Sequence, residues 1–237
     1  MSCLIQFISL TILGIYIINL YFIKRLTYLI ADRYVLLTTM GGLVLVIIGL
    51  IGIYFILRSE PFKLKKFFKN WNILLIIIPI SFFFLPLRTL SSESFNIRSA
   101  TSAFKISSQE KSQIQDKISF NVDTNTFSLY DWVKAKSIGD TSIFVGKEFT
   151  ATGFITPTDS DKQFILSRFV VSCCVVDATP AGMLIEYDYK SKYQANDWLE
   201  VKGKFEIKAI NGSLQPIVIP IDVKKIDQPD NVYLNRN

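Results

Sequence analysis

Apolar residues are concentrated in the first ninety positions of the chain, whereas later positions alternate between apolar and polar residues. The stretch from Leu4 to Ile23 contains no charged residue, and neither does the stretch from Tyr34 to Leu57. Each is long enough to cross the roughly 30 Å hydrocarbon core of a bilayer as a helix. A third uncharged run contains Pro79, which a membrane helix tolerates when neighbouring groups satisfy the freed carbonyl. The pattern predicts a transmembrane region at residues 1–90 with three helices, at about 4–23, 34–57 and 71–87.

The next segment, residues 91–125, is rich in Ser, Gln, Asn, Lys and Thr and shows no apolar periodicity. Such a composition is typical of a linker between two folded parts. Within it, residues 108–117 fit a short helix, and residues 118–122 fit a first strand. We therefore expect a polar linker that ends near the start of the C-terminal domain.

From Thr126 the chain changes to short alternating segments separated by turn residues, which is typical of an all-β unit. Five strands in about a hundred residues suit a partly open barrel of the oligonucleotide/oligosaccharide-binding (OB) type. Gly203 lies inside one predicted strand, where it indicates a bend or bulge. We expect a multi-domain membrane protein whose residues 126–237 form an all-β, OB-like, partly open barrel. The predicted elements are a helix at 127–136, strands at 147–155, 163–174, 183–189, 198–207 and 216–223, and hairpin turns at 159–162 and 211–212.

The net charge of +6 arises in the membrane region and not in the C-terminal domain. From Thr126 onward, 13 Lys and Arg residues oppose 14 Asp and Glu residues, which leaves a net charge of −1. The loop between the second and third predicted helices is basic, and the positive-inside rule places such a loop in the cytoplasm. We therefore expect a multi-pass protein of the plasma membrane, in contact with the lipid bilayer, whose C-terminal domain is extracytoplasmic. The basic residues of this loop are Arg58, Lys63, Lys65, Lys66 and Lys69.

Enzyme and nucleic-acid functions find no support in the residues of the chain. Histidine is absent, and neither a G-x-S-x-G motif nor a phosphate-binding P-loop occurs. The near-neutral C-terminal domain lacks the positive charge that attracts phosphate groups. Four aromatic residues are therefore expected at an edge, an interface or the core instead of on a base-stacking platform. They are Tyr187, Tyr189, Tyr193 and Trp198.

The main candidate for chemistry is the segment Arg168-Phe-Val-Val-Ser-Cys-Cys-Val-Val-Asp177-Ala-Thr-Pro180, which contains two of the three cysteines. Two adjacent thiols indicate a possible reactive site, because thiolates oxidise, bind metals and exchange disulfides. The possible ligands at this site are Cys173, Cys174 and Asp177. Arg168 is a further motif residue, which could pair with Asp177 or with a carboxylate of a partner protein.

Three interpretations of this segment stay open. Two thiolates and the carboxylate of Asp177 suit zinc or another thiophilic metal, such as copper(I) or an arsenic-like ion, if a bulge brings both sulfurs to one face of the strand. The two thiols also suit a redox switch that closes a strained disulfide between adjacent residues. Alternatively, one cysteine packs in the core, the other lies at a subunit interface, and Asp177 caps the following loop.

Three segments together carry a resemblance to a known family: Leu85-Pro-Leu-Arg-Thr-Leu90, Gly146-Lys-Glu-Phe-Thr-Ala-Thr-Gly153 and the segment around the two cysteines. Over nearly its whole length the chain resembles the YcgQ-like membrane proteins. This resemblance implies one subunit of a two-component permease, beside a YcgR-like multi-span partner that is similar to permeases exporting thiophilic compounds. Its motif positions here are Arg168, Cys173, Cys174, Asp177 and Pro180.

The predicted spans carry no carboxylate, lysine or arginine that would form an ion pathway, which favours an accessory role over autonomous transport. The alternative is a stand-alone, membrane-anchored thiol protein that binds metal or senses redox state.

Overall fold

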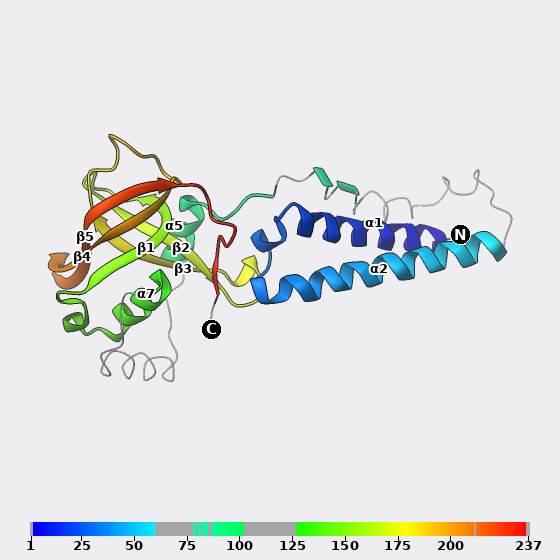
Figure 1. Ribbon diagram of the computed structural model, residues 1–237, viewed down its shortest axis with the longest axis horizontal. Coiled ribbons are helices and arrows are strands. Elements are labelled where there is room, and N and C mark those ends of the chain that lie inside the picture. The colour runs from blue at the N-terminus through cyan, green and yellow to red at the C-terminus, as the bar shows by residue number, and fades with distance from the viewer. Residues whose placement is uncertain are drawn as a thin grey trace. The chain divides into compact units, whose positions relative to one another are not determined.

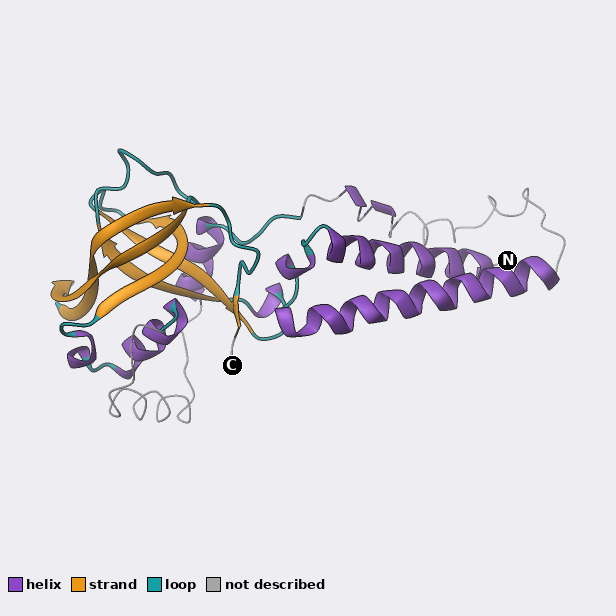
Figure 2. Ribbon diagram, in the orientation of Figure 1, coloured by secondary structure: helices purple, strands orange, loops and turns teal. Residues whose placement is uncertain are grey.

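The computed structural model describes residues 2–59, 78, 80, 81, 83, 84, 87–101, 127–210 and 212–235, which fall into two compact units (Figure 1). The first unit comprises Met1–Arg88 together with the short segment Cys173–Val175. The second unit comprises Thr89–Ser172 and Val176–Asn237. As Figure 2 shows, the two long helices belong to the first unit and the strands of the sheet belong to the second.

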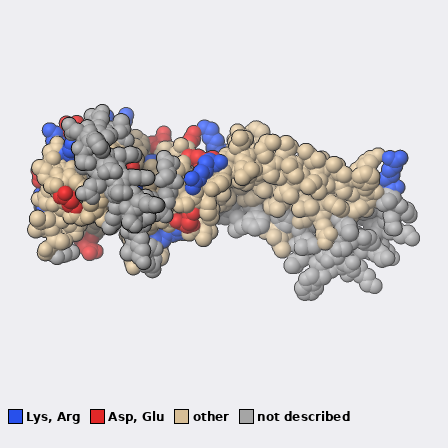
Figure 3. Space-filling view, turned by 90° about the horizontal axis from the view of Figure 1, so that it is seen from below, with Lys and Arg blue, Asp and Glu red and all other residues tan. Residues whose placement is uncertain are grey.

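The first unit is built on two long apolar helices, α1 (Ser2–Phe22) and α2 (Asp32–Ser59), joined through a short 3₁₀ turn at Leu26–Tyr28. Both are long and apolar enough to cross a membrane, which is weak evidence for membrane association. On the face shown in Figure 3, charged side chains of the helix pair appear only toward its two ends. The third predicted span, at residues 71–87, lies mostly outside the described residues.

The two helices are antiparallel, and glycines allow them to approach closely. A Cβ atom placed on Gly49 would lie 2.1 Å from the hydroxyl oxygen of Thr11, and one placed on Gly52 would lie 2.3 Å from the ring of Phe7. Further along the pair, Gly14 of α1 lies against Gly42 of α2. Small residues of this kind are the usual means by which membrane helices pack backbone against backbone.

The second unit contains a six-stranded mixed sheet whose strand order is β1-β4-β5-β3-β2-β6. An additional pairing of β1 with β2 bends the first five strands into a partly closed ring, in which β3 and β5 meet at the single parallel pair Ile185↔Val218. Strand β6 pairs in parallel with the end of β2. The expected strand-rich C-terminal domain is thus confirmed as a mixed sheet. Its strands are β1 (Glu148–Pro157), β2 (Gln163–Val171), β3 (Thr179–Glu186), β4 (Trp198–Ile210), β5 (Ser213–Ile226) and β6 (Leu234–Asn235).

Aromatic residues fill the interior of the ring and connect it to the helix α7 (Leu129–Ile138) and the 3₁₀ helix η4 (Thr141–Phe144). The indole of Trp132 is fully buried and its centroid lies 4.7 Å from that of Phe205 on β4. Tyr189, Tyr193 and Trp198 are also buried, and the first two belong to this core. These three rings therefore pack in the interior, as the sequence predicts for a core position.

Most strand boundaries differ from the sequence predictions by only a few residues. The predicted bulge at Gly203 is confirmed, because the register between β4 and β5 shifts between Lys202 and Gly203. Strand β2 ends at Val171 and not at Cys174, so that the prediction of one continuous strand through both cysteines is wrong. The predicted helix at 127–136 corresponds to α7, whereas the predicted elements at 108–117 and 118–122 lie outside the described residues.

The segment predicted as a linker, residues 91–125, begins differently in the structure. Its first part forms the helix α5 (Ser92–Thr101), which belongs to the second unit. The ring of Phe95 lies 6.0 Å from that of Phe169 on β2, and the Ser92 amide donates to the side-chain oxygen of Asn196 at 2.7 Å. The only large apolar residues of α5 are Phe95 and Ile97, which are two positions apart, so that the sequence shows no helical periodicity here.

Candidate functional site

The two adjacent cysteines lie where the chain leaves β2, and their sulfur atoms approach each other. In a regular strand adjacent side chains point to opposite faces, but here the strand has ended at Val171 and the chain bends at Ser172 and Cys173. The two Sγ atoms are 3.6 Å apart. This separation is well above the length of an S–S bond, so that the pair is a dithiol. The bend therefore does what the metal interpretation requires of a bulge.

Backbone hydrogen bonds fix the segment Cys173–Val175, here called the thiol segment, within the first unit. The Ala31 amide donates to the Cys173 carbonyl at 3.0 Å, and the Val175 amide donates to the Leu29 carbonyl at 2.8 Å. Between these two bonds, Ile30 and Cys174 form an antiparallel β-bridge. The thiol segment is thus paired with the connection between α1 and α2.

Asp177 acts on the backbone of the chain that leads to the thiol segment. Its Oδ1 atom accepts a hydrogen bond from the Ser172 amide at 3.0 Å, and the residue ends the 3₁₀ helix η5 (Val175–Asp177). A side-chain carboxylate that accepts from a nearby amide stabilises a local bend. This contact is with the segment before Asp177, whereas the third interpretation of the sequence has Asp177 cap the loop after it, and that role stays a prediction.

The exposure of the two thiols differs, since Cys173 is exposed and Cys174 is half-buried. Neither belongs to a buried core cluster of the described residues. Reagents and ligands can therefore reach Cys173 directly. Among the residues that the structure describes, no group of three or more His, Cys, Asp and Glu side chains is arranged to hold a metal ion. The metal site at Cys173, Cys174 and Asp177 and the redox switch both stay predictions.

Arg168 lies on β2 with its side chain buried, 8% exposed, and binds the C-terminal end of the chain. Its Nε atom donates to the Val232 carbonyl at 3.3 Å, and its Nη2 atom donates to the Asn231 carbonyl. The guanidinium carbon lies 5.4 Å from the centroid of the Trp198 ring, within the range of a cation–π contact. These contacts give Arg168 a structural role in holding the C-terminal end against β2.

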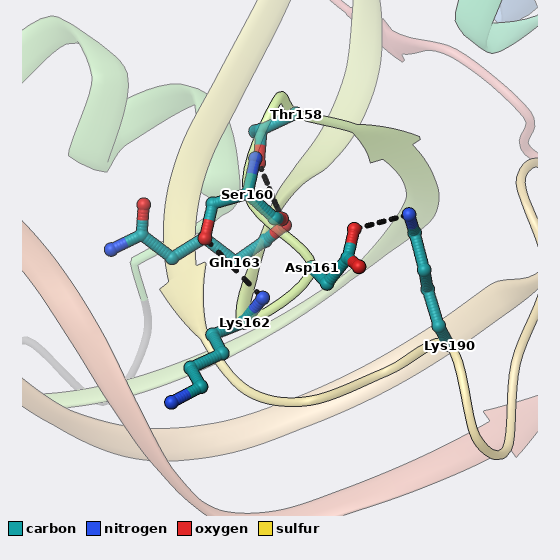
Figure 4. A network of polar contacts seen from close by, with 6 residues as sticks. All are labelled: Thr158, Ser160, Asp161, Lys162, Gln163 and Lys190. Atoms are coloured by element: carbon teal, nitrogen blue, oxygen red, sulfur yellow. Dashed lines mark hydrogen bonds and ion pairs between the residues drawn. The ribbon is translucent and has the colours of Figure 1, made fainter.

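A second polar cluster lies at the turn between β1 and β2 (Figure 4). The Thr158 hydroxyl donates to the Gln163 carbonyl at 2.8 Å, and the Ser160 hydroxyl oxygen accepts from the Lys162 amide at 3.3 Å. Lys190 reaches across from the β3–β4 connection to form an exposed ion pair with Asp161, which raises the pKa of the lysine through this hydrogen bond. Turn residues of this kind satisfy their own backbone, so that the cluster stabilises a loop.

The sequence did not indicate which residues, distant in the chain, form the hydrogen bonds that stabilise the candidate site. Leu29–Ala31 are apolar residues that contribute only backbone groups, and Asn231 and Val232 contribute only carbonyl groups. Arg98 of α5 donates to the Ala178 carbonyl, one residue after Asp177, at 2.7 Å. Because backbone carbonyls are present at every position, no residue pattern marks the ones that are used.

The described residues define a class of protein that combines a pair of long apolar helices, a mixed-sheet domain and two adjacent thiols, of which one is exposed and the other half-buried. Residues 98–236 match the DUF1980 C-terminal domain, and this match covers more than half of the chain. The protein therefore belongs to this uncharacterised family. No curated protein and no solved structure matches the chain.

Proposed function

We propose that this protein is the membrane-anchored accessory subunit of a two-component permease and that Cys173 and Cys174 receive a thiophilic substrate. In this proposal the chain is YcgQ-like, the partner is a YcgR-like multi-span permease, and the C-terminal domain is extracytoplasmic in the plasma membrane. The observation that carries the proposal is the pairing of the thiol segment with the connection between α1 and α2. A dithiol with one exposed sulfur is thereby linked to the end of a helix pair that is apolar enough to span a membrane.

The ring of strands supports an OB-like fold for the C-terminal domain. Neighbours around the ring follow the order β1-β2-β3-β5-β4, which returns to β1. A five-stranded, partly open barrel of this kind presents loops and strand ends that are commonly used for binding. We propose that the domain presents the thiol segment to the partner, with the substrate passing between the two proteins.

The charge pattern of the helices supports an accessory role. The described apolar stretches 4–22 and 34–57 contain no ionisable carboxylate, lysine or arginine. Transporters use such residues within the membrane for ion and proton pathways. We therefore assign the translocation pathway to the partner and the docking of the partner to these helices.

Affinity purification of the tagged full-length protein from membranes in mild detergent tests the proposal. We expect mass spectrometry to find one multi-span permease at near-equal stoichiometry. The matched variant Cys173→Ser, Cys174→Ser retains the helices, so it is expected to recover the same permease but to lose transport of a thiophilic substrate by the complex. Full transport by this variant would contradict the proposed role of the thiols.

A stand-alone, membrane-anchored thiol protein is the second candidate, and the exposure of Cys173 favours it to the same degree as the first. The same purification separates the two functions. Recovery of the intact, folded chain without a permease would support the stand-alone function and would remove the subunit function.

A further inference from the structure

We infer that Cys173 and Cys174 chelate a trivalent metalloid such as arsenite, with the protein supplying two sulfur ligands and the third bond belonging to the ligand itself. The inference rests on the proposed role of these thiols in handling a thiophilic substrate and names the class of that substrate. Three properties of the pair carry it: the separation of the sulfurs, the number of ligands that the chain supplies, and the fixed backbone of the thiol segment.

The separation of the sulfurs sets the angle at a shared atom. With sulfur–metal bonds of about 2.3 Å, the 3.6 Å between the two Sγ atoms corresponds to an angle of about 100°. An ion bound linearly by two sulfurs would require them to be about 4.6 Å apart at the same bond length. The observed pair therefore suits a bent or pyramidal centre, which is the geometry of trivalent arsenic and antimony.

The number of ligands distinguishes a metalloid from zinc, which also accepts an angle near this value. Structural zinc sites use four protein ligands, and catalytic ones use three. The chain has no histidine, and its described residues include no group of three potential metal ligands. A trivalent metalloid requires only two thiols from the protein, because its third position keeps a hydroxyl or an organic group. Thiolates are also the soft ligands that such centres prefer.

The backbone around the thiols is already fixed in the geometry that brings both sulfurs to one side. The Cys173 carbonyl accepts from Ala31, Val175 donates to Leu29, and the Ser172 amide donates to Asp177. The first sulfur to bind therefore places the second within reach of the same atom. Because this second bond forms within one molecule, the effective concentration of the second thiol is high and the overall affinity rises.

The binding step is a ligand exchange without oxidation or reduction. Two As–O bonds of arsenite break and two As–S bonds form with Cys173 and Cys174. The two thiol protons leave with the two released hydroxyl groups as two water molecules, and arsenic remains trivalent. No oxidant or reductant is needed.

The test uses the full-length protein in detergent with Cys3→Ser as the background, so that only two thiols are titrated. We expect one equivalent of phenylarsine oxide or arsenite to remove both thiols from reaction with a colorimetric thiol reagent. Cys173→Ser and Cys174→Ser should each lower the affinity by at least about 100-fold, because each removes the intramolecular bond. Zinc, titrated against a metallochromic indicator, should bind more weakly than the arsenical.

A second measurement covers the possibility that a serine variant fails to fold. Mass spectrometry after alkylation of the unsubstituted thiol pair should show that bound arsenical protects both cysteines together. Loss of only one thiol per arsenical, equal affinity in a single-cysteine variant, or tighter binding of zinc would overturn the inference. These assays need no partner, so they test the metalloid site separately from the subunit function. A chain that co-purifies with a permease but fails to bind the arsenical would keep the subunit function and lose the metalloid site. A chain that binds the arsenical but recovers no permease would keep the metalloid site and lose the subunit function.

Discussion

Arg168 illustrates how one buried side chain holds two distant parts of the sequence together. Its guanidinium group donates to the carbonyls of Asn231 and Val232 while it faces the ring of Trp198. Strand β6, which follows these carbonyls by two residues, pairs with Val170 and Val171 at the end of β2. Arg168 thus stabilises the pairing that immediately precedes the bend at the thiols.

We predict that Arg168→Lys releases the C-terminal residues even though it keeps the positive charge. A lysine cannot reproduce the planar fork that contacts two carbonyls, and hydrogen bonds to charged groups contribute about 1.5–3 kcal/mol each. Hydrogen exchange of the full-length protein should show faster exchange at Leu234 and Asn235. The control Lys202→Arg lies on the exposed side of β4 and should leave the exchange unchanged. Unchanged protection in Arg168→Lys would show that the contacts are dispensable.

The capping carboxylate of α7 gives a prediction about pH. Burial disfavours ionisation of Asp131, but hydrogen bonds from the Ser128 hydroxyl and from Lys134 outweigh it, so that the pKa of this carboxyl is below its usual value. Because the pKa of Asp131 is lower in the folded state than in the unfolded state, its ionised carboxylate stabilises the fold. This stabilisation is fully present above the unfolded-state pKa, near 4, and is lost as the pH falls through the folded-state pKa.

We therefore predict that Asp131→Asn lowers the stability of α7 by about 1 kcal/mol at pH 7, as expected for loss of a capping interaction. Thermal unfolding followed by tryptophan fluorescence should show the difference from the parent protein at pH 6 to 8, and the difference should shrink below about pH 4. A difference that stayed constant down to pH 3 would mean that the charge of Asp131 has no part in it.

At this scale the sequence predicts which residues matter but not what they contact. The cysteine pair is rare enough to be noticed, and Asp177 has the spacing of a loop cap. For Arg168 the sequence suggests a carboxylate as a possible partner, and it gives no sign of the two carbonyls, some sixty positions away in the sequence, to which its side chain donates. Side-chain type restricts the chemistry of a contact, but the fold decides which distant backbone groups come within reach.

Among the elements, the connection between α1 and α2 has a direct influence on the thiols. The carbonyl that accepts from Ala31 is part of the peptide group that joins Cys173 to Cys174. Ile30, the residue before Ala31, forms the β-bridge with Cys174. Removing the Ala31 amide is thus a precise way to release the thiol segment.

We predict that Ala31→Pro increases the alkylation rate of the half-buried Cys174 several-fold, because proline has no N–H to donate to Cys173. The rate is measured with iodoacetamide and mass spectrometry in the Cys3→Ser background. Ala31→Ser keeps the amide and is the matched control, with an unchanged rate expected. Equal rates in both variants would show that the bridge does not restrain the thiol segment.

The glycines of the helix pair give a prediction with a control on the same helix. Gly49 faces Thr11 so closely that any side chain must displace α1, whereas a Cβ on Gly41 has no atom within 4 Å in the described structure. Gly49→Leu should therefore cost about 1–3 kcal/mol through overpacking, and Gly41→Leu should cost little. The midpoint of thermal aggregation in detergent checks both. A similar loss in the two variants would point to a general effect of leucine on α2.

The ends of helices and strands were predictable where the local pattern of apolar and polar residues determines them. They were not predictable where a contact with a residue distant in the sequence determines them. The alternation of residues and the glycine in β4 predict that strand and its bulge. The end of β2 is different, because the apolar run continues past Val171 into Val175 and Val176 while the chain bends. Asp177 and the α1–α2 connection determine that bend, and neither is adjacent to it in the alternating pattern.

For the molecule as a whole, the distribution of charge separates two environments. The apolar stretches of α1 and α2 have no charged residue, whereas basic and acidic residues nearly balance from Thr126 onward. Exposed apolar side chains such as Leu36, Phe55 and Leu57 on α2 would be costly in water but are ordinary in contact with lipid. The balanced charges of the sheet domain are instead typical of a surface in contact with water.

The side of the membrane on which the thiols lie is the last prediction. In the proposed topology the basic loop that follows α2 in the sequence is cytoplasmic by the positive-inside rule, and the α1–α2 connection lies on the opposite side of the membrane. Since the thiol segment pairs with this connection, we predict that a membrane-impermeant maleimide labels Cys173 in intact cells that carry the Cys3→Ser variant.

Permeabilised cells of the same strain give the full extent of labelling, and Cys173→Ser shows how much of it belongs to the exposed thiol. Labelling that requires permeabilisation would place the dithiol in the cytoplasm. In that case the proposed extracytoplasmic handling of the substrate would be wrong. Chelation by the two sulfurs would not be affected, because the separation of the sulfurs, the number of ligands and the fixed backbone of the thiol segment do not depend on the side of the membrane. The arsenical titration would still test it.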